Sequence, residues 1–202
     1  MAVHKGVRFL KKDPVMKKII DSVGGYTLKK RRHHFAVLIE SIISQQLATR
    51  AADVIFCRFK DLYPKFPTAE EVLATRNSRL RSAGLSGMKV EYIKDLAGKI
   101  SQGKVRLGAL SKMSDEEVVA HLTQVKGIGR WTAEMFLIFS LERPDVLPVH
   151  DLGLQKGVQI AFSLHELPKP SEVENIGRRW RPYRSIATWY LWKSLQNFSK
   201  IG

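Results

Sequence analysis

A short turn, Gly127-Ile128-Gly129, separates two helical patterns and constrains the fold more than any other feature of the sequence. Apolar side chains recur at helical spacing from residue 118 to 125, and residues 135–141 are apolar almost all round. Glycine lets the backbone bend where a Cβ would clash, and the first N–H groups of the second helix lack helical partners. Because the positive end of a helix dipole lies behind such groups, they favour an anion. The sequence therefore predicts two helices joined by a tight turn that can hold an anion.

The charge of the chain points to the kind of anion. Lys and Arg number 34 against 19 Asp and Glu in 202 residues, which gives a net charge of +15. Such an excess favours a polyanionic partner, either a nucleic acid or an anionic membrane surface, although a merely soluble basic protein has the same balance. No helical pattern pairs a basic face with a continuous apolar one, so a nucleic acid is the favoured partner and no membrane is expected.

Cysteine content and apolar run lengths restrict the compartment and the cofactors. The single Cys57 rules out a disulfide framework, an iron–sulfur cluster and a multi-cysteine zinc site. Because Cys57 lies in the apolar run 54–59, we expect a buried, inert thiol. The N-terminus lacks an apolar signal core and no stretch approaches the length of a membrane span. We expect an intracellular protein, in the cytoplasm or nucleoid, or in the nucleus of a eukaryote.

Helical periodicity recurs through the whole chain, and its clearest example is the stripe Phe35, Leu38, Ile39, Ile42 and Ile43. No run shows convincing alternation with a period of two, so the predicted fold class is all-α. The basic segment 1–12 is expected to be irregular.

Helix starts are marked by residues that satisfy the first free N–H groups. Asp13 and Pro14 form an N-cap and a first helical residue. Ser114 followed by Glu117 has the pattern of a capping box. Pro67-Thr68 followed by Glu70 and Glu71 begins another helix, with acids in its first turn. These signals predict helices that begin close to residues 14, 69 and 115.

Four stretches in a fixed order resemble one family of proteins. They are LTQVKGIGRWTA at 122–133, VHDLGLQ at 149–155, ISQQ at 43–46 and WRPYRS at 180–185, and Gly84-Leu85-Ser86 with Lys89 also fits. Together they resemble the superfamily of DNA glycosylases named for a helix-hairpin-helix, a Gly/Pro-rich loop and a catalytic Asp. The last two stretches are similar to its alkylbase branch, the 3-methyladenine-DNA glycosylase II family. The likeness extends from about residue 35 to 195.

This resemblance implies a two-lobed helical domain over residues 1–202, with the active-site cleft between the lobes. One lobe would combine residues 1–34 and 142–202, and the other would contain 35–141 with the helix-hairpin-helix at 115–141. We expect a monomer that acts on double-stranded DNA with damaged bases, without the extra N-terminal domain of some relatives.

Asp151 stands where the resembling family carries its catalytic carboxylate. An Asp at a helix start is commonly only an N-cap, and the two roles are compatible. Cleavage of an N-glycosidic bond builds positive charge on the sugar, which a fixed carboxylate stabilises while it orients or deprotonates water. His150 departs from many relatives, so only Asp151 is carried over.

Trp131 stands where the bifunctional branch of the superfamily has a nucleophilic Lys. A tryptophan cannot form a Schiff base with the sugar, so the resemblance implies a monofunctional, hydrolytic glycosylase without lyase activity.

Trp131 and Tyr183 match family positions that wall the base pocket, and Met135 replaces an aromatic residue found in some relatives. An aromatic face attracts a cationic alkylated purine by about 0.5–2 kcal/mol. The alternative is that these side chains are ordinary core residues.

DNA contacts are expected from two places. Gln46 aligns with the wedge that fills the gap left by a flipped base, although an exposed loop glutamine is common. The hairpin would hold a phosphate through backbone N–H groups at Gly127, Gly129 and Trp131, with charge from Lys126 or Arg130. No cofactor is expected, apart from a sodium or potassium ion that similar hairpins hold through carbonyls, here those of Thr123, Val125 and Ile128.

The resemblance thus implies excision of alkylated purines in base excision repair. The preferred base, 3-methyladenine, 7-methylguanine, hypoxanthine or an ethenoadduct, stays open. The alternatives are a DNA-binding module without catalysis and a bifunctional glycosylase for oxidised bases. Asp151 and the aromatic pair argue against the first, and Trp131 argues against the second.

Overall fold

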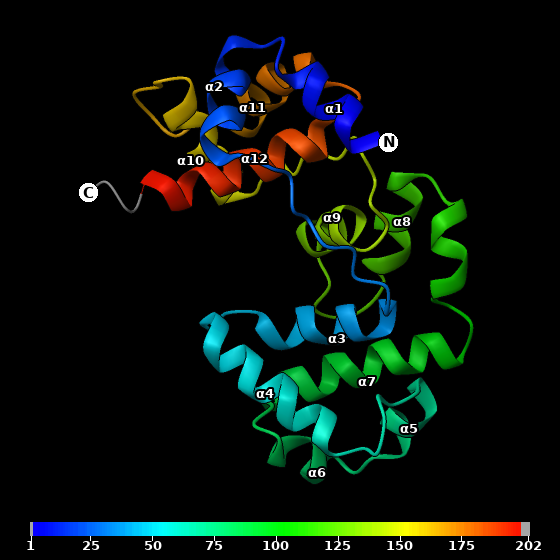
Figure 1. The fold of residues 1–202 in the computed structure, drawn as a ribbon. Coiled ribbons are helices and arrows are strands. Elements are labelled where there is room, and N and C mark those ends of the chain that lie inside the picture. The colour runs from blue at the N-terminus through cyan, green and yellow to red at the C-terminus, as the bar shows by residue number, and fades with distance from the viewer. Residues whose placement is uncertain (1, 199–202) are drawn as a thin grey trace. The chain divides into compact units, whose positions relative to one another are not determined.

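The computed structural model describes residues 2–198, and over these residues the chain forms helices joined by loops, without a strand (Figure 1). Residues 1 and 199–202, which the predicted first lobe includes, lie outside the described residues. The all-α prediction is confirmed. None of the helices in the described part is long and apolar enough to cross a bilayer.

The contacts divide the chain into two compact units. Unit 1 contains the described residues up to Lys30 and those from Leu137 onward, and unit 2 is Arg31–Phe136. The predicted lobes meet at residues 34/35 and 141/142, a few residues after the limits of the two units. The arrangement of the lobes around a cleft stays a prediction.

Unit 1 is built around the C-terminal helix α12. Its elements are α1 (Ala2–Leu10), α2 (Pro14–Val23), α10 (Leu152–Ala161), α11 (Pro170–Gly177), the 3-10 helix η2 (Arg178–Trp180) and α12 (Arg184–Phe198). Helices α10, α2 and α1 all pack on α12. Trp180 and Leu191 are completely buried in the shared core, and the Tyr190 hydroxyl donates to the Gly24 carbonyl at 3.1 Å.

The prediction of an irregular N-terminus is wrong, because residues Ala2–Leu10 form α1. The apolar residues Val7 and Leu10 lie on one side of this helix and join the core of unit 1. A Cβ on Gly6 would lie 2.5 Å from the Ile186 side chain and 2.9 Å from that of Tyr183. Glycine therefore lets α1 approach α12 closely, and burial of its apolar side stabilises this short helix. The basic residues between the apolar ones make the helical pattern hard to recognise in the sequence.

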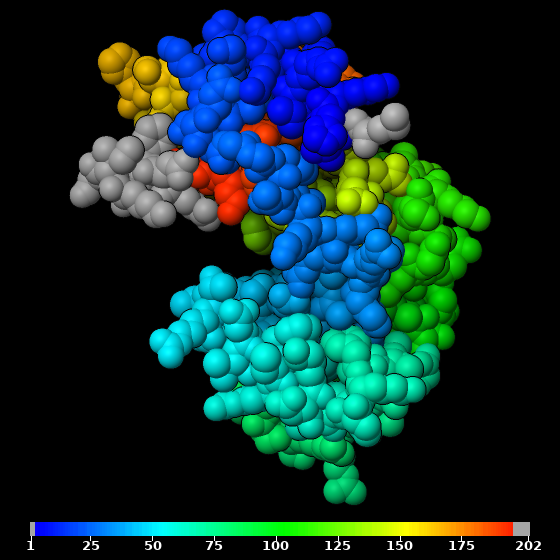
Figure 2. Space-filling model, in the orientation of Figure 1, coloured from blue at the N-terminus to red at the C-terminus, as the bar shows by residue number. Residues whose placement is uncertain are grey.

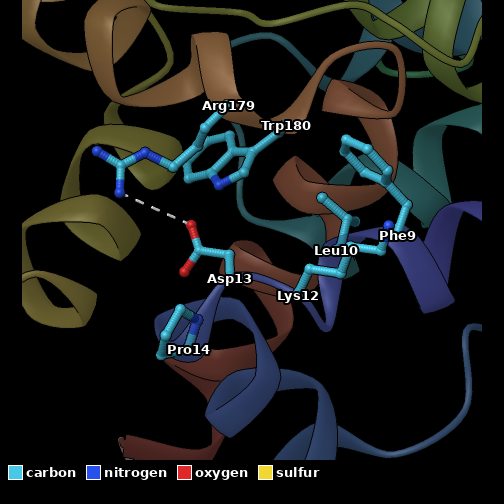
Figure 3. A pocket seen from close by; sticks show the side chains of 7 residues that line it. All are labelled: Phe9, Leu10, Lys12, Asp13, Pro14, Arg179 and Trp180. Atoms are coloured by element: carbon cyan, nitrogen blue, oxygen red, sulfur yellow. Dashed lines mark ion pairs between the residues drawn. The ribbon is translucent and has the colours of Figure 1, made fainter.

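The start of α2 confirms the predicted cap. Asp13 Oδ1 accepts hydrogen bonds from the N–H groups of Val15 at 2.9 Å and Met16 at 3.2 Å, and Pro14 is the first helical residue. Figure 3 shows the Asp13 carboxylate facing Arg179, whose Nη1 lies 3.8 Å from Oδ2. These side chains border a pocket of about 400 Å³ lined by Phe9, Leu10, Lys12, Asp13, Pro14, Arg179 and Trp180.

Unit 2 is organised around α3 and α7. Its elements are α3 (His34–Ser44), α4 (Thr49–Asp61), α5 (Ala69–Ala74), α6 (Asn77–Ser82), α7 (Gly87–Ser101), the 3-10 helix η1 (Leu107–Lys112), α8 (Asp115–Leu122) and α9 (Arg130–Phe139), whose last turn belongs to unit 1. Helix α7 packs against α3, α5 and α6. All five residues of the predicted stripe on α3 are buried, which confirms that prediction.

Ser114 and Glu117 form the predicted capping box at the start of α8. The predicted helix start at Thr68 has the same arrangement, in which the Thr68 side chain accepts from the Glu71 N–H and the Glu71 carboxylate accepts from the Thr68 N–H. The expectation of a buried Cys57 is wrong, because this residue lies on the exposed side of α4. Only one side of that helix faces the core, and the apolar run that contains Cys57 is longer than the buried stripe.

Candidate functional site

Asp151 is the N-cap of α10, and two N–H donors hold its Oδ1 atom. Oδ1 accepts the Leu154 N–H at 2.6 Å and the indole N–H of Trp192 at 2.7 Å. The residue is only 9% exposed. A short side chain with two donors on one oxygen has little rotational freedom, so the carboxylate is presented in one fixed orientation.

Trp192 is the functional candidate that the sequence did not reveal. It lies on α12, 41 residues after Asp151, and its ring stacks on Phe139 at 5.8 Å between centroids with an interplanar angle of 10°. Periodicity assigns Trp189 and Tyr190 to the core face of α12 but leaves Trp192 on its flank. The only available signal was the presence of a further tryptophan on the helix that follows the WRPYRS stretch.

Two glycines of α10 permit this arrangement. A Cβ on Gly153 would lie 3.1 Å from Asp151 Oδ1 and 3.2 Å from Cδ1 of Trp192. A Cβ on Gly157, one turn later, would lie 3.1 Å from both Cβ and the carbonyl oxygen of Leu191. The backbones of α10 and α12 therefore approach each other closely beside the carboxylate.

Tyr183 lies at the other end of α12. Its ring packs on Phe9 at 5.5 Å between centroids and borders a cavity of about 330 Å³ together with Tyr26 and Glu142. Trp192 follows nine residues later, which is about 13 Å along a helix. The predicted residue Tyr183 and the residue Trp192, found only in the structure, thus lie well apart on unit 1. Of the two, Trp192 is the one that contacts Asp151.

The hairpin turn, residues 126–129, is braced from α7. Gly127 has a φ of 79°, and a Cβ there would lie 2.1 Å from the Tyr92 ring, so only glycine fits. The Lys126 N–H donates to Asp95 Oδ2 at 2.8 Å, which removes one backbone donor from those available to a phosphate. The predicted donors of Gly127, Gly129 and Trp131 lie at and beyond the sharpest part of the turn.

The two predicted basic contacts of the hairpin are paired with acids. Lys126 Nζ lies 2.5 Å from Glu91 Oε1, and this hydrogen bond raises the pKa of Lys126. Arg130 makes two hydrogen bonds to Glu116, at 2.6 and 3.0 Å, which raise the pKa of its guanidinium. The Arg130 pair joins α9 to α8, while both cations stay exposed enough to exchange a carboxylate for a phosphate.

Gln46 lies in the turn between α3 and α4, which we name the wedge loop (residues 44–48). Its side chain is exposed and its φ is 56°, a conformation uncommon for a residue with a Cβ. The neighbouring Gln45 turns the other way, and its Nε2 donates to the Gly127 carbonyl at 2.6 Å. Figure 2 shows the start of α4, in cyan, projecting from the surface of unit 2 next to this loop.

The remaining predicted positions lie on α8, the hairpin turn and α9. Trp131 is 49% exposed in the first turn of α9, and Met135 follows one turn later and is half-buried. Thr123 is the C-cap of α8, and the Val125 carbonyl accepts the Ile128 N–H at 3.1 Å. Within the described part of the chain, no three His, Cys, Asp or Glu side chains are grouped to hold a metal ion.

The chain has two helices joined by a glycine turn, followed by an Asp that caps the start of a later helix. This combination defines a helix-hairpin-helix protein with a candidate catalytic Asp. The sequence model of the family described as "HhH-GPD superfamily base excision DNA repair protein" matches residues 39–182. The chain belongs to this family.

Curated relatives are similar over most of the chain. DNA-3-methyladenine glycosylase 1 of Schizosaccharomyces pombe is 36% identical over 188 residues, which cover 90% of this chain and 82% of that protein. The alkylbase DNA glycosidase-like protein mag2 of the same organism is 33% identical over 181 residues, 87% of this chain and 85% of that protein. These relatives confirm the predicted resemblance to the alkylbase branch.

Solved structures agree with the fold. The Schizosaccharomyces pombe 3-methyladenine DNA glycosylase Mag1, in complex with abasic DNA, matches with a TM-score of 0.86 and 35% identity. The match covers 95% of this chain and 97% of that chain. The DNA-3-methyladenine glycosidase of Bacillus halodurans has a TM-score of 0.87 and 33% identity, with 96% and 91% covered.

Proposed function

We propose that this protein is a monofunctional DNA glycosylase that removes alkylated purines, of the 3-methyladenine and 7-methylguanine type, from double-stranded DNA. The observation that carries the proposal is the carboxylate of Asp151, fixed by the Leu154 N–H and the Trp192 indole. The named relatives that act on 3-methyladenine support the same substrate class. We further propose that the protein acts as a monomer inside the cell.

In the proposed reaction, the bond between the sugar C1′ and the purine nitrogen breaks and the purine leaves with the bonding electron pair. An alkylated purine is cationic, so it departs as a neutral base. The Asp151 carboxylate stabilises the positive charge that develops on the sugar, and a water oxygen bonds to C1′ while its proton passes to that carboxylate. Trp131 offers no amine to compete with water, so an abasic site is the product.

The aromatic residues have separate proposed roles. Trp131 would stack on the flipped cationic base, with Met135 beside it, and Trp192 would keep Asp151 in place. Tyr183 stays a predicted pocket residue, although its contact with Phe9 favours a role in the core of unit 1. Gln46 would fill the gap in the duplex, and the hairpin would hold a phosphate. The cation site formed by the carbonyls of Thr123, Val125 and Ile128 also stays a proposal.

The test compares the protein with its Asp151→Asn variant on duplexes that each contain one alkylated purine. Cleavage at the lesion should appear only after hot alkali, and borohydride should trap no covalent adduct. The Asn side chain can still accept both hydrogen bonds, so folding and DNA binding should persist while excision falls by about 100-fold or more.

The matched control is Asp61→Asn at the exposed end of α4, which should excise at the normal rate. Near-normal excision by Asp151→Asn would remove the catalytic assignment. Binding without abasic sites on any lesion would instead favour the non-catalytic DNA-binding module.

A further inference from the structure

Lys89, near the start of α7, holds the end of another helix. Its Nζ donates to the Ile43 carbonyl at 2.6 Å and to the Gln45 carbonyl at 3.0 Å. Helix α3 ends at Ser44, so the ammonium group satisfies carbonyls that the last helical turn leaves without partners. Burial lowers the pKa of Lys89, so its charged group is kept there against a desolvation cost.

The same face of α7 also contacts the hairpin turn. Tyr92, one turn after Lys89, packs against Gly127, and Asp95, a further turn on, accepts the Lys126 N–H. One helix face therefore supports both the wedge loop and the hairpin turn.

A direct bond joins these two elements as well. The Gln45 side chain donates to the Gly127 carbonyl at 2.6 Å, while Lys89 holds the Gln45 carbonyl. Gln46 follows immediately in a left-handed conformation, which persists only where the surroundings fix it. The two bonds of Gln45, together with the Leu47 N–H that donates to the Ser44 carbonyl at 3.2 Å, fix the loop at this point.

We propose that Lys89 and Gln45 are positioning residues that lock the wedge loop to the hairpin turn. When the turn holds a phosphate, the lock sets where Gln46 enters the duplex, so that the phosphate contact and the flipped base lie at a fixed separation. This inference rests on the proposed function, in which Gln46 is the wedge and the turn is the anchor.

The test uses Lys89→Met, which keeps the length of the side chain and removes its donors, and Gln45→Met. Both should bind undamaged duplex within about twofold of the parent, because the phosphate contacts remain. Both should reduce the fluorescence increase of a duplex with 2-aminopurine at the flipping position. Their single-turnover excision should fall by about 10- to 100-fold, as expected for a displaced positioning group. Lys89→Arg, which keeps the charge and donors, should recover most of this loss.

Lys94 provides a matched control on the same helix. Its Nζ also donates to two carbonyls, those of Leu73 and Thr75, both at 2.6 Å, and burial also lowers its pKa. Lys94→Met should therefore lower the thermal stability of the protein about as much as Lys89→Met and leave flipping unchanged.

A double variant separates positioning from simple destabilisation. If Lys89 acts through Gln46, Lys89→Met combined with Gln46→Ala should flip no worse than Gln46→Ala alone. Additive losses, unchanged flipping in Lys89→Met, or equal losses in Lys94→Met would overturn the proposal. The fluorescence measurement needs no excision, so it tests this inference independently of the proposed function. A protein that flips bases without removing them would contradict the proposed function, and the fluorescence of its variants would still decide whether Lys89 and Gln45 position Gln46.

Discussion

Gly153 lies in a narrow place beside the carboxylate of Asp151, the proposed catalytic group. The position admits no side chain at ordinary van der Waals distance, because Asp151 Oδ1 and the Trp192 indole lie on the side where a Cβ would project. Both of these groups are fixed by their mutual hydrogen bond. A methyl group at this position must therefore displace one of them by a few tenths of an ångström.

We expect Gly153→Ala to reduce excision by about 10-fold without weakening DNA binding, because small misplacements of reacting groups are costly for rate. Excision kinetics and binding anisotropy measure the two effects. Gly98→Ala is the matched control, since its Cβ would have its nearest contact at 3.9 Å. Unchanged excision in Gly153→Ala would show that the carboxylate has more freedom than its contacts indicate.

At the residue scale, the sequence predicted positions better than partners. The N-cap role of Asp151 could be predicted because capping is a local property of a helix start. Its partner Trp192 could not, since the contact joins residues far apart in the chain and tryptophan is equally at home in a core.

Helix α8 carries a pH-sensitive contact with the loop before η1. The Arg106 N–H donates to Nε2 of His121 at 2.9 Å, which requires a neutral imidazole. Burial, followed by the charge of Arg106, lowers the pKa of His121 below its ordinary value of 6.5. As the pH falls toward 6.5 and below it, His121 binds a proton more readily in the unfolded chain than in the folded chain. The free energy of unfolding therefore decreases as the pH falls.

We therefore expect the parent protein to lose stability between about pH 7.5 and about pH 5.5 in urea titrations, and His121→Gln to lose less. Glutamine can still accept the N–H and does not titrate. His165→Gln, at an exposed position, is the control and should follow the parent. Identical pH profiles for His121→Gln and the parent would contradict the assignment.

At the element scale, predictions succeeded where one local rule determines the outcome. The caps at Asp13 and Ser114, the helix start at Thr68 and the apolar stripe of α3 are all present as expected. Helix α1 was missed because its stability comes from packing through Gly6 against α12, which no local pattern records.

The charge of the whole molecule predicts strongly salt-dependent DNA binding. With a net charge of +15, binding should release counterions, and the logarithm of the association constant should fall linearly with the logarithm of salt concentration. If Lys126 exchanges Glu91 for a phosphate, Lys126→Met should reduce the magnitude of this slope by about 1.

Lys17→Met is the control for this measurement, because it removes one charge from an exposed pair with Asp21 on α2. It should leave the slope close to that of the parent. Equal changes in both variants would mean that Lys126 contributes only to the general field of the protein and not to a phosphate contact.

The composition of unit 1 could not be derived from local patterns. Its first thirty residues and its C-terminal part are separated by all of unit 2. The family resemblance predicted that both ends of the chain share a lobe, whereas periodicity alone says which face of a helix is apolar and not which helix covers it.

The close approach of Gly157 to Leu191 has a consequence for protein engineering. A slide of α10 by one turn along α12, about 5.4 Å, would carry Asp151 away from the Trp192 indole. The place where the two backbones cross therefore determines the position of the carboxylate. To transfer Asp151 and Trp192 to another scaffold, α10 and α12 should be moved together as one packed pair. The two side chains alone do not determine their relative position.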